Sequence, residues 1–184
     1  MKYPNFILVF ILSVLTSCIK DSASDSGEDK VKIGDALPEF AVEMNDGNII
    51  STEDVKGKVS VITFFHTLCP DCQTELPVLQ KVYEEYSGDD GVVIFAVSRE
   101  ESDDDVSEYW GENGFTIPYS AQEDRAVYEM FSTLGIPKIY ISDREMVVRY
   151  IHSDVDMPTS DVLKYEINSL INDCLLYTSD AADE

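Results

Sequence analysis

The chain alternates continuous apolar runs with segments in which apolar residues recur every three or four positions. The runs at residues 59–65 and 92–97 have the length and continuity of strands that are covered on both faces. Between them, the spacing predicts a helix through the following apolar positions: Leu76, Leu79, Val82, Tyr83 and Tyr86. A strand, a helix and a second strand in this order predict a parallel crossover within one sheet.

Two further strands are predicted at residues 138–142 and 146–151. The turn sequence Asp143-Arg144-Glu145 separates them, so they are expected to pair antiparallel. A short extra strand is predicted at residues 118–120. Near the start of the domain, two short apolar runs flank Asp46-Gly47, which is a typical hairpin turn. The pattern therefore predicts a central mixed sheet preceded by an N-terminal β-hairpin.

Three more helices complete the pattern. The acidic run 100–105 is interpreted as the solvated cap of a helix that ends at Asn113-Gly114. Its packing residues are Tyr109, Trp110 and Phe115. Another helix is predicted at residues 126–131, and a last one begins after Thr159 or Ser160. The fold class is α/β, a central mixed sheet flanked by helices, with a helix-containing insertion after the second core strand.

The N-terminal segment has the pattern of a secretory signal. Residues 1–17 combine Lys2 with the apolar run 6–12, which is too short to span a bilayer. The run ends in Leu15-Thr16-Ser17-Cys18, which resembles the lipobox of bacterial lipoproteins. This resemblance implies that Cys18 is lipidated and becomes the mature N-terminus, attached to a membrane by its acyl chains. The alternative is an ordinary signal peptide with an incidental cysteine.

Composition separates a tether from a domain. Residues 18–30 contain the lipidated cysteine and a flexible acidic stretch with almost nothing apolar. Residues 31–173 form one domain, and the apolar fraction of 44% in 184 residues is enough for a core. The net charge of −23 would repel nucleic acid, so we exclude nucleic-acid binding.

The last residues break the pattern. Residues 174–184 resemble the translation, in one reading frame, of a transposase-type sequencing adapter. We therefore hypothesise that the native chain ends near Asp173 and that this tail is an assembly artefact. Codons that do not spell the adapter would contradict this hypothesis.

With the lipobox cysteine and the tail cysteine set aside, Cys69 and Cys72 remain as a pair. Residues three apart share a helix face, and their Cα separation falls within the roughly 4.4–6.8 Å that a disulfide tolerates. A lone histidine at a strand end, such as His66, is expected to be structural. Because His152 is distant in sequence, two thiols and two histidines do not predict a zinc site. No metal and no cofactor other than a redox-active disulfide is expected.

Six marks in order make residues 31–173 resemble the TlpA/ResA-like members of the thioredoxin superfamily, which are envelope-anchored thiol–disulfide oxidoreductases. They are the Gly34/Pro38/Phe40 opening, the Asp46-Gly47 hairpin, Cys69-Pro70-Asp71-Cys72, Glu75-Leu76-Pro77, the insertion after the second core strand, and Gly135-Ile136-Pro137. The resemblance implies a thioredoxin-like fold and a membrane-anchored enzyme that reduces disulfides of extracytoplasmic proteins, including cytochrome c precursors in some relatives. It also implies a membrane thiol–disulfide electron donor and a place in the cell envelope, on the periplasmic or outer-surface side.

The two thiols are expected to have different roles. Cys69 lies at a helix start, where unpaired N–H groups and the helix dipole favour a thiolate, so it is predicted to attack the client disulfide. Cys72, one turn further and partly covered, is predicted to resolve the mixed disulfide. Asp71 and Glu75 oppose the helix dipole, and residues 66–80 contain no Lys or Arg. A fairly reducing couple is therefore expected, and a potential of about −120 mV would contradict this.

The resemblance also assigns residues around the thiols. In the ResA-like subgroup a carboxylate matching Glu75 tunes the thiols, although a plain solvated helix residue is the alternative. Pro137 matches the cis-proline that faces the CxxC motif, where Ile136 backbone groups pair with an extended substrate segment. The predicted substrate-contacting residues are Ile136, Pro137, Pro70 and Leu68.

Two residues depart from the family pattern. Leu68 stands where the family usually has Trp, so the surface offered to a substrate is different. Thr63 occupies the strand position where thioredoxins proper have a buried Asp, and a hydroxyl is a poor proton acceptor. Glu75 or water would have to fill that role.

Two other functions remain open. A peroxiredoxin-type peroxidase requires a Pro-x-x-x-Thr-x-x-Cys loop, whereas here Thr67 is one residue too close to the cysteine and the proline is absent. The other alternative is a non-enzymatic lipoprotein that serves as a binding module, which the intact CxxC motif argues against.

Overall fold

The computed structural model describes residues 28–179, with side chains described as far as residue 172. The predicted signal peptide, Cys18 and most of the predicted tether lie outside the described residues. The elements are β1 (Ala41–Glu43), β2 (Ile49–Ser51), the 3₁₀ helix η1 (Thr52–Val55), β3 (Val59–Phe65), α1 (Pro70–Tyr86), β4 (Val92–Ser98), α2 (Asp103–Asn113), β5 (Tyr119–Ser120), α3 (Tyr128–Phe131), β6 (Lys138–Ser142), β7 (Val148–Ser153) and α4 (Ser160–Ser179).

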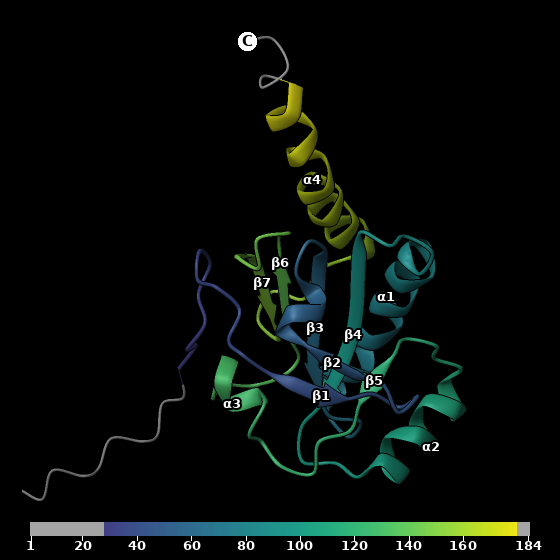
Figure 1. Ribbon diagram of the computed structural model, residues 1–184. Coiled ribbons are helices and arrows are strands. Elements are labelled where there is room, and N and C mark those ends of the chain that lie inside the picture. Colours follow the sequence, from purple (N-terminus) through teal and green to yellow (C-terminus); the bar gives the residue numbers. More distant parts are fainter. Residues whose placement is uncertain (1–27, 180–184) are drawn as a thin grey trace, which may run out of the picture.

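The central sheet has the strand order β5-β4-β3-β6-β7 (Figure 1). Strand β3 pairs parallel with β4 and antiparallel with β6, and β7 pairs antiparallel with β6. β1 and β2 form a separate antiparallel hairpin, joined by a turn in which Gly47 has φ of +80°. The mixed sheet, the parallel crossover and the N-terminal hairpin predicted from the apolar pattern are therefore confirmed.

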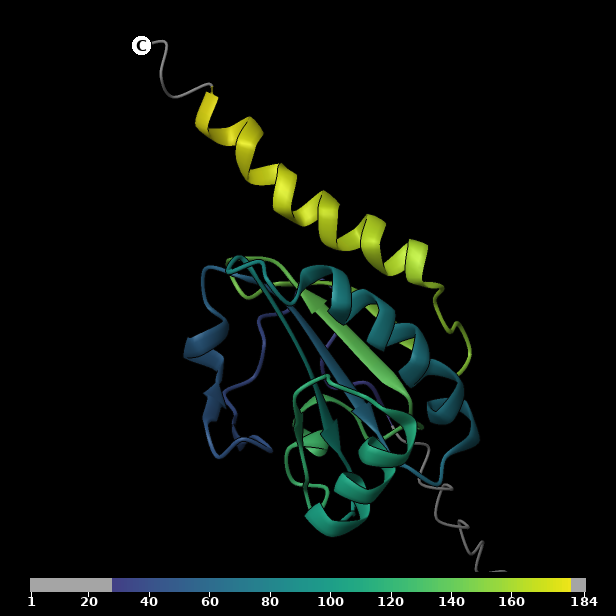
Figure 2. The ribbon, with the colours of Figure 1, turned by 90° about the vertical axis from the view of Figure 1, so that its right-hand side faces the viewer.

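Helices cover the sheet on both faces. Helices α1 and α4 pack against each other on one face (Figures 1 and 2). The other face carries an aromatic cluster in which Phe64 and Tyr140 of the sheet meet Tyr128 and Phe131 of α3. The apolar runs of β3 and β4 are buried almost throughout, as expected for strands covered on both faces.

The insertion after β4 folds as the sequence predicts. Ser102 caps α2 by accepting a hydrogen bond from the N–H of Asp105, and Gly114 ends the helix in the left-handed conformation. Trp110 is 5% exposed and packs on Phe65 at the end of β3, with ring centroids 4.9 Å apart. The insertion is thus anchored next to the strand that leads into Cys69.

Several boundaries differ from the predicted ones, among them that of β7, which spans Val148–Ser153 where a strand was predicted at residues 146–151. Helix α3 is a single turn, because Asp124 accepts a hydrogen bond from the N–H of Ala126 and forms a turn where helix was predicted. At the other end of the sequence, α4 continues to Ser179, beyond the predicted domain end. Contacts of the domain begin before Val31, since the N–H of Lys30 also donates to the carbonyl of Phe131. Within residues 28–179, the helices are all too short or too polar to cross a membrane.

Candidate active site at the start of helix α1

Strand β3 delivers both thiols to one end of the sheet. Cys69 has extended backbone angles and is the N-cap residue of α1, and Pro70 follows at the first helical position, where its fixed φ fits and its missing N–H costs nothing. Both cysteines are free thiols, with Cys69 half-buried and Cys72 fully buried. One sulfur is therefore accessible to a partner and the other is enclosed.

The thiol of Cys69 faces the segment that was predicted to receive substrate. It donates a hydrogen bond to the carbonyl of Ile136, with 3.5 Å between sulfur and oxygen. The bond between Ile136 and Pro137 is cis, which confirms the family-based prediction. However, within the described residues the Cys69 side chain makes no capping hydrogen bond to the α1 amides. The expected contact between its sulfur and the helix N–H groups is therefore not formed.

Cys72 is more enclosed than predicted. Its exposed fraction is 0%, so the description of it as partly covered is wrong. Burial raises the pKa of the Cys72 thiol far above its ordinary value, and contact with Cys69 acts in the same direction. A group close by must therefore accept the proton before Cys72 can attack.

Glu75 is the carboxyl group that the sequence predicted to act on the thiols. It lies one turn beyond Cys72 on the same helix face and is 2% exposed, so the alternative of a solvated residue is wrong. Burial raises the pKa of Glu75 to about 7, and the charge of His152 opposes the rise. Among the described residues, no group donates a hydrogen bond to its Oε1 atom.

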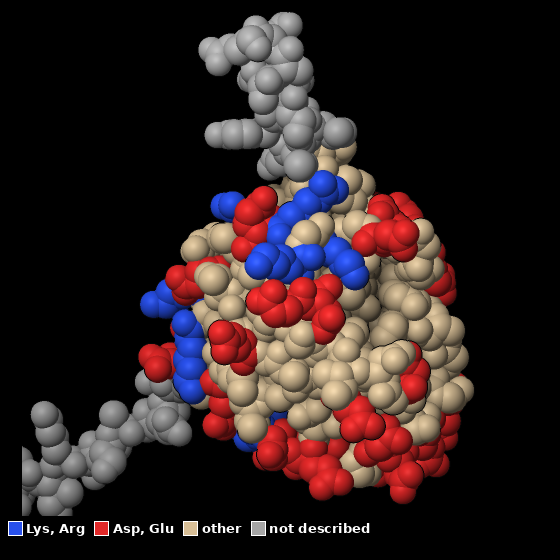
Figure 3. Space-filling view, viewed as in Figure 1, with Lys and Arg blue, Asp and Glu red and all other residues tan. Residues whose placement is uncertain are grey.

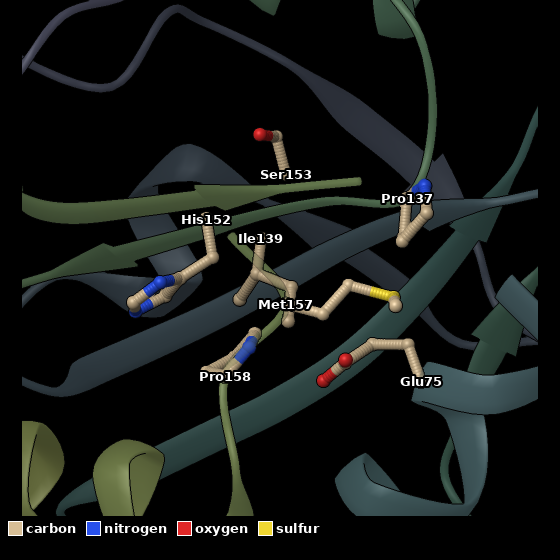
Figure 4. Close-up of a pocket in the computed structure, with 7 residues that line it drawn as sticks. All are labelled: Glu75, Pro137, Ile139, His152, Ser153, Met157 and Pro158. Carbon is tan, nitrogen blue, oxygen red and sulfur yellow. The ribbon is translucent and has the colours of Figure 1, made fainter. Parts of the chain in front are cut away.

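A narrow pocket surrounds the Glu75 carboxyl group. Figure 4 shows Glu75 entering from α1, opposite residues of β6 and β7. The lining residues are Glu75, Pro137, Ile139, His152, Ser153, Met157 and Pro158. The pocket has no room for a water molecule, so solvent does not satisfy the unpaired oxygen in this conformation.

Thr63 is buried in the middle of β3 at 0% exposure, and within the part of the chain that the structure describes its hydroxyl oxygen has no hydrogen-bond partner. Thr63 therefore stands where thioredoxins proper have a buried Asp, and it does not supply a proton acceptor. Of the two substitutes that the sequence suggested, Glu75 follows Cys72 by three positions on α1, and its side chain is buried.

The loop before Cys69 is held by a residue that the sequence analysis misassigned. Glu101 belongs to the acidic run that was interpreted as a solvated cap, yet it is only 5% exposed. Its carboxylate accepts hydrogen bonds from the N–H of Thr67, at 2.9 and 3.0 Å, and from the Thr67 hydroxyl. His66 Nδ1 accepts from the N–H of Leu68 at 3.1 Å and lies 3.2 Å from Glu101 Oε1. The contact that holds the loop therefore comes from a residue 34 positions further along the chain than Thr67.

The outer surface next to Cys69 is apolar on one side and acidic on the other. Leu68 is 78% exposed and Pro70 is also exposed, so both remain available for the predicted substrate contact. Beside Leu68 a groove of about 450 Å³ runs between the loop and α2. Its acidic lining residues are Glu100, Glu101, Asp105, Glu108 and Glu112. Figure 3 shows carboxylates gathered over α2, whereas most Lys and Arg side chains in that view lie near the opposite end of the domain.

The residues predicted to act together are brought together. Cys69, Cys72, Glu75, Ile136 and Pro137 all lie where the start of α1 meets the start of β6. Among residues 28–179, the structure holds no group of three or more His, Cys, Asp or Glu side chains arranged as a metal site.

Comparison with known proteins agrees with this architecture. The AhpC/TSA family model matches residues 33–151. The thiol-disulfide oxidoreductase ResA of Bacillus cereus is 26% identical over 139 residues, which cover 76% of this chain and 80% of the relative. ResA of Bacillus subtilis is 28% identical over 147 residues, covering 78% and 82%. The thioredoxin domain of a thiol-disulfide oxidoreductase from Bacteroides vulgatus superposes with a TM-score of 0.61 at 23% identity, covering 74% of this chain and 99% of that one. The chain belongs to the AhpC/TSA family, and within it resembles ResA as a thioredoxin-superfamily protein.

Proposed function

We propose that this protein is a membrane-anchored thiol–disulfide oxidoreductase that reduces disulfides of extracytoplasmic proteins. The observation that carries the proposal is the pairing of a half-buried Cys69, hydrogen-bonded to the Ile136 carbonyl, with a fully buried Cys72. An accessible thiol suits attack on a client, and a covered thiol suits reaction only with its neighbour. The names of the ResA relatives support the same activity.

The reaction proceeds by two exchanges. The Cys69 thiolate attacks one sulfur of a client disulfide, so that a mixed disulfide forms and one client thiolate leaves. Glu75, as a carboxylate, takes the proton of Cys72, whose thiolate then attacks the Cys69 sulfur. The Cys69–Cys72 disulfide forms, the second client thiolate leaves, and two electrons have passed to the client. No cofactor beyond this disulfide is required.

The direction of electron flow follows from the charges near the thiols. Asp71 is exposed within the motif and the acidic groove lies beside the loop, so negative charge disfavours a thiolate and the couple should be reducing. A membrane thiol–disulfide donor would then restore the dithiol after each turnover. The lipid anchor at Cys18, the place in the cell envelope and a share in cytochrome c maturation belong to this proposal and rest on the sequence resemblance.

The decisive experiment uses a trapping variant. Cys72→Ala cannot resolve the mixed disulfide, so client proteins should stay covalently bound to Cys69 in native envelopes and be released by dithiothreitol. The matched control is Cys69→Ala, which keeps the buried thiol and should capture nothing. Equal capture by both variants would refute the roles assigned to the two cysteines.

A peroxidase is the second candidate, because the AhpC/TSA family model covers the site. Two observations at Thr67 argue against a peroxidase. Its hydroxyl donates a hydrogen bond to Glu101, and Thr67 precedes Cys69 by two positions instead of three. Peroxide consumption by the wild-type protein at a rate above that of Cys69→Ala, together with failure to capture clients, would favour the peroxidase.

A further inference from the structure

Three side chains lie side by side across the sheet beneath helices α1 and α4. In the strand register, Thr63 of β3 is opposite Ile139 of β6, and Ile139 is opposite His152 of β7. Directly paired residues point to the same face of a sheet. The position where thioredoxins proper have a buried acid is therefore connected, by one row of side chains, to a histidine two strands away.

His152 is held firmly at the end of this row. Its Nε2 atom lies 2.8 Å from Oε2 of Glu166 on α4, and its Nδ1 atom lies 3.8 Å from Oδ2 of Asp156. The side chains of His152 and Glu166 are only 13% and 10% exposed. Both nitrogens of the imidazole therefore lie near a carboxylate of another residue.

The charged groups around Glu75 are few. Helix α1 contributes Glu75 itself, and β7 contributes His152 and Ser153 (Figure 4). The other lining residues are Pro137 just before β6, Ile139 of β6, and Met157 and Pro158 of the connection to α4. Glu166 and Asp156 contact the far side of the imidazole. Among these lining residues, His152 is the one group besides Glu75 that can carry a charge. No water-sized space separates the groups, so little screening is available.

We propose that His152, anchored by Glu166, is a positioning residue that acts on Glu75 through the charge of its imidazole and thereby sets the pH range of thiol exchange. The inference rests on the proposed function, in which Glu75 takes the Cys72 proton. A cation near the pocket favours the carboxylate over the neutral acid, so Glu75 is available as a base at lower pH than burial alone would allow. The work done by a buried Asp in thioredoxins proper is thus shared here by two residues on different elements.

The test compares four full-length proteins: wild type, His152→Gln, His152→Lys and Glu166→Gln. Carboxyl ¹³C NMR titration of the reduced proteins gives the midpoint of Glu75, whose resonance is assigned by its loss in Glu75→Gln. The pH profile of insulin disulfide reduction, driven by dithiothreitol, gives the exchange activity. Circular dichroism at each pH checks that every variant is folded.

His152→Gln should move the Glu75 midpoint and the acid limb of the profile to higher pH by roughly one unit. A shift of this size is ordinary for the loss of one nearby charge at an effective dielectric constant of about 20. Glu166→Gln should shift the Glu75 midpoint and the acid limb in the same direction, by a smaller amount than His152→Gln. His152→Lys, which restores a cation, should bring both back toward wild type, whereas loss of a merely structural contact would not be rescued by Lys.

An unchanged Glu75 midpoint in both His152→Gln and Glu166→Gln would overturn the inference. So would a shifted midpoint with an unchanged pH profile, because the charge would then have no effect on exchange. Failure of the proposed function would look different, since the wild-type protein itself would not reduce insulin.

Discussion

Replacing Glu75 with Gln should make the protein's stability less dependent on pH. Glu75 is 2% exposed, and burial raises its pKa from 4.5 to about 7 against the opposing charge of His152. One pKa unit corresponds to about 1.36 kcal/mol, so ionising Glu75 costs the folded state about 3 kcal/mol. Because the folded pKa lies above the unfolded value, the contribution of the neutral carboxyl group is complete below pH 4.5. It is lost as the pH rises to about 7.

The quantity to measure is the difference in free energy of unfolding between Glu75→Gln and wild type. Urea titrations between pH 4.5 and 8, with a phosphine reductant to keep both thiols reduced, should show this difference growing in favour of the variant by about 3 kcal/mol. Glu112→Gln, which removes an exposed carboxylate from α2, is the matched control and should run parallel to wild type. A constant difference for Glu75→Gln across this range would refute the claim that the carboxyl group is desolvated.

Three further outcomes are expected. Thr63→Val should raise the free energy of unfolding by about 1 kcal/mol in urea titrations, since none of the described residues pairs with the buried hydroxyl; a loss of stability would contradict this. Glu101→Gln should lower the free energy of unfolding by about 1–2 kcal/mol, because the Thr67 donors lose a charged acceptor. Glu108→Gln, at an exposed residue of α2, should leave the free energy of unfolding unchanged, and equal effects of the two variants would argue against the buried contact. Leu68→Glu should reduce kcat/KM for insulin roughly fivefold, about half the effect of burying a whole Leu, without loss of stability. The same change at exposed Ile49 on the hairpin should leave kcat/KM unchanged, and a matching loss there would make the Leu68 effect nonspecific.

The parts of the fold that depend on local pattern could be predicted from the sequence. The apolar runs predicted β3 and β4 to within a residue, and the apolar spacing after the CxxC motif predicted a helix that begins there, with Cys69 at its N-cap and Cys72 in its first turn. The cis bond before Pro137 came from the family resemblance, because the dipeptide alone favours trans.

The parts that depend on contacts between distant elements could not be predicted. The burial of Glu75 is completed by Met157 and Pro158, which fold over it from the connection between β7 and α4. Glu101 looked like its acidic neighbours, and nothing in its local sequence indicates that it reaches the loop at Thr67. His152 enters the site through the register of β6 and β7, which a single sequence does not specify.

The contact between Glu101 and Thr67 has a consequence for protein engineering. It joins the first residues of the insertion to the loop that carries the attacking cysteine, and Trp110 adds a second attachment at Phe65. A chimaera that exchanges the insertion at a boundary between β4 and α2 would separate the two ends of these contacts. Grafts between relatives should therefore transfer the loop and the insertion as one unit, because an insertion moved alone would leave Thr67 with buried donors and no acceptor.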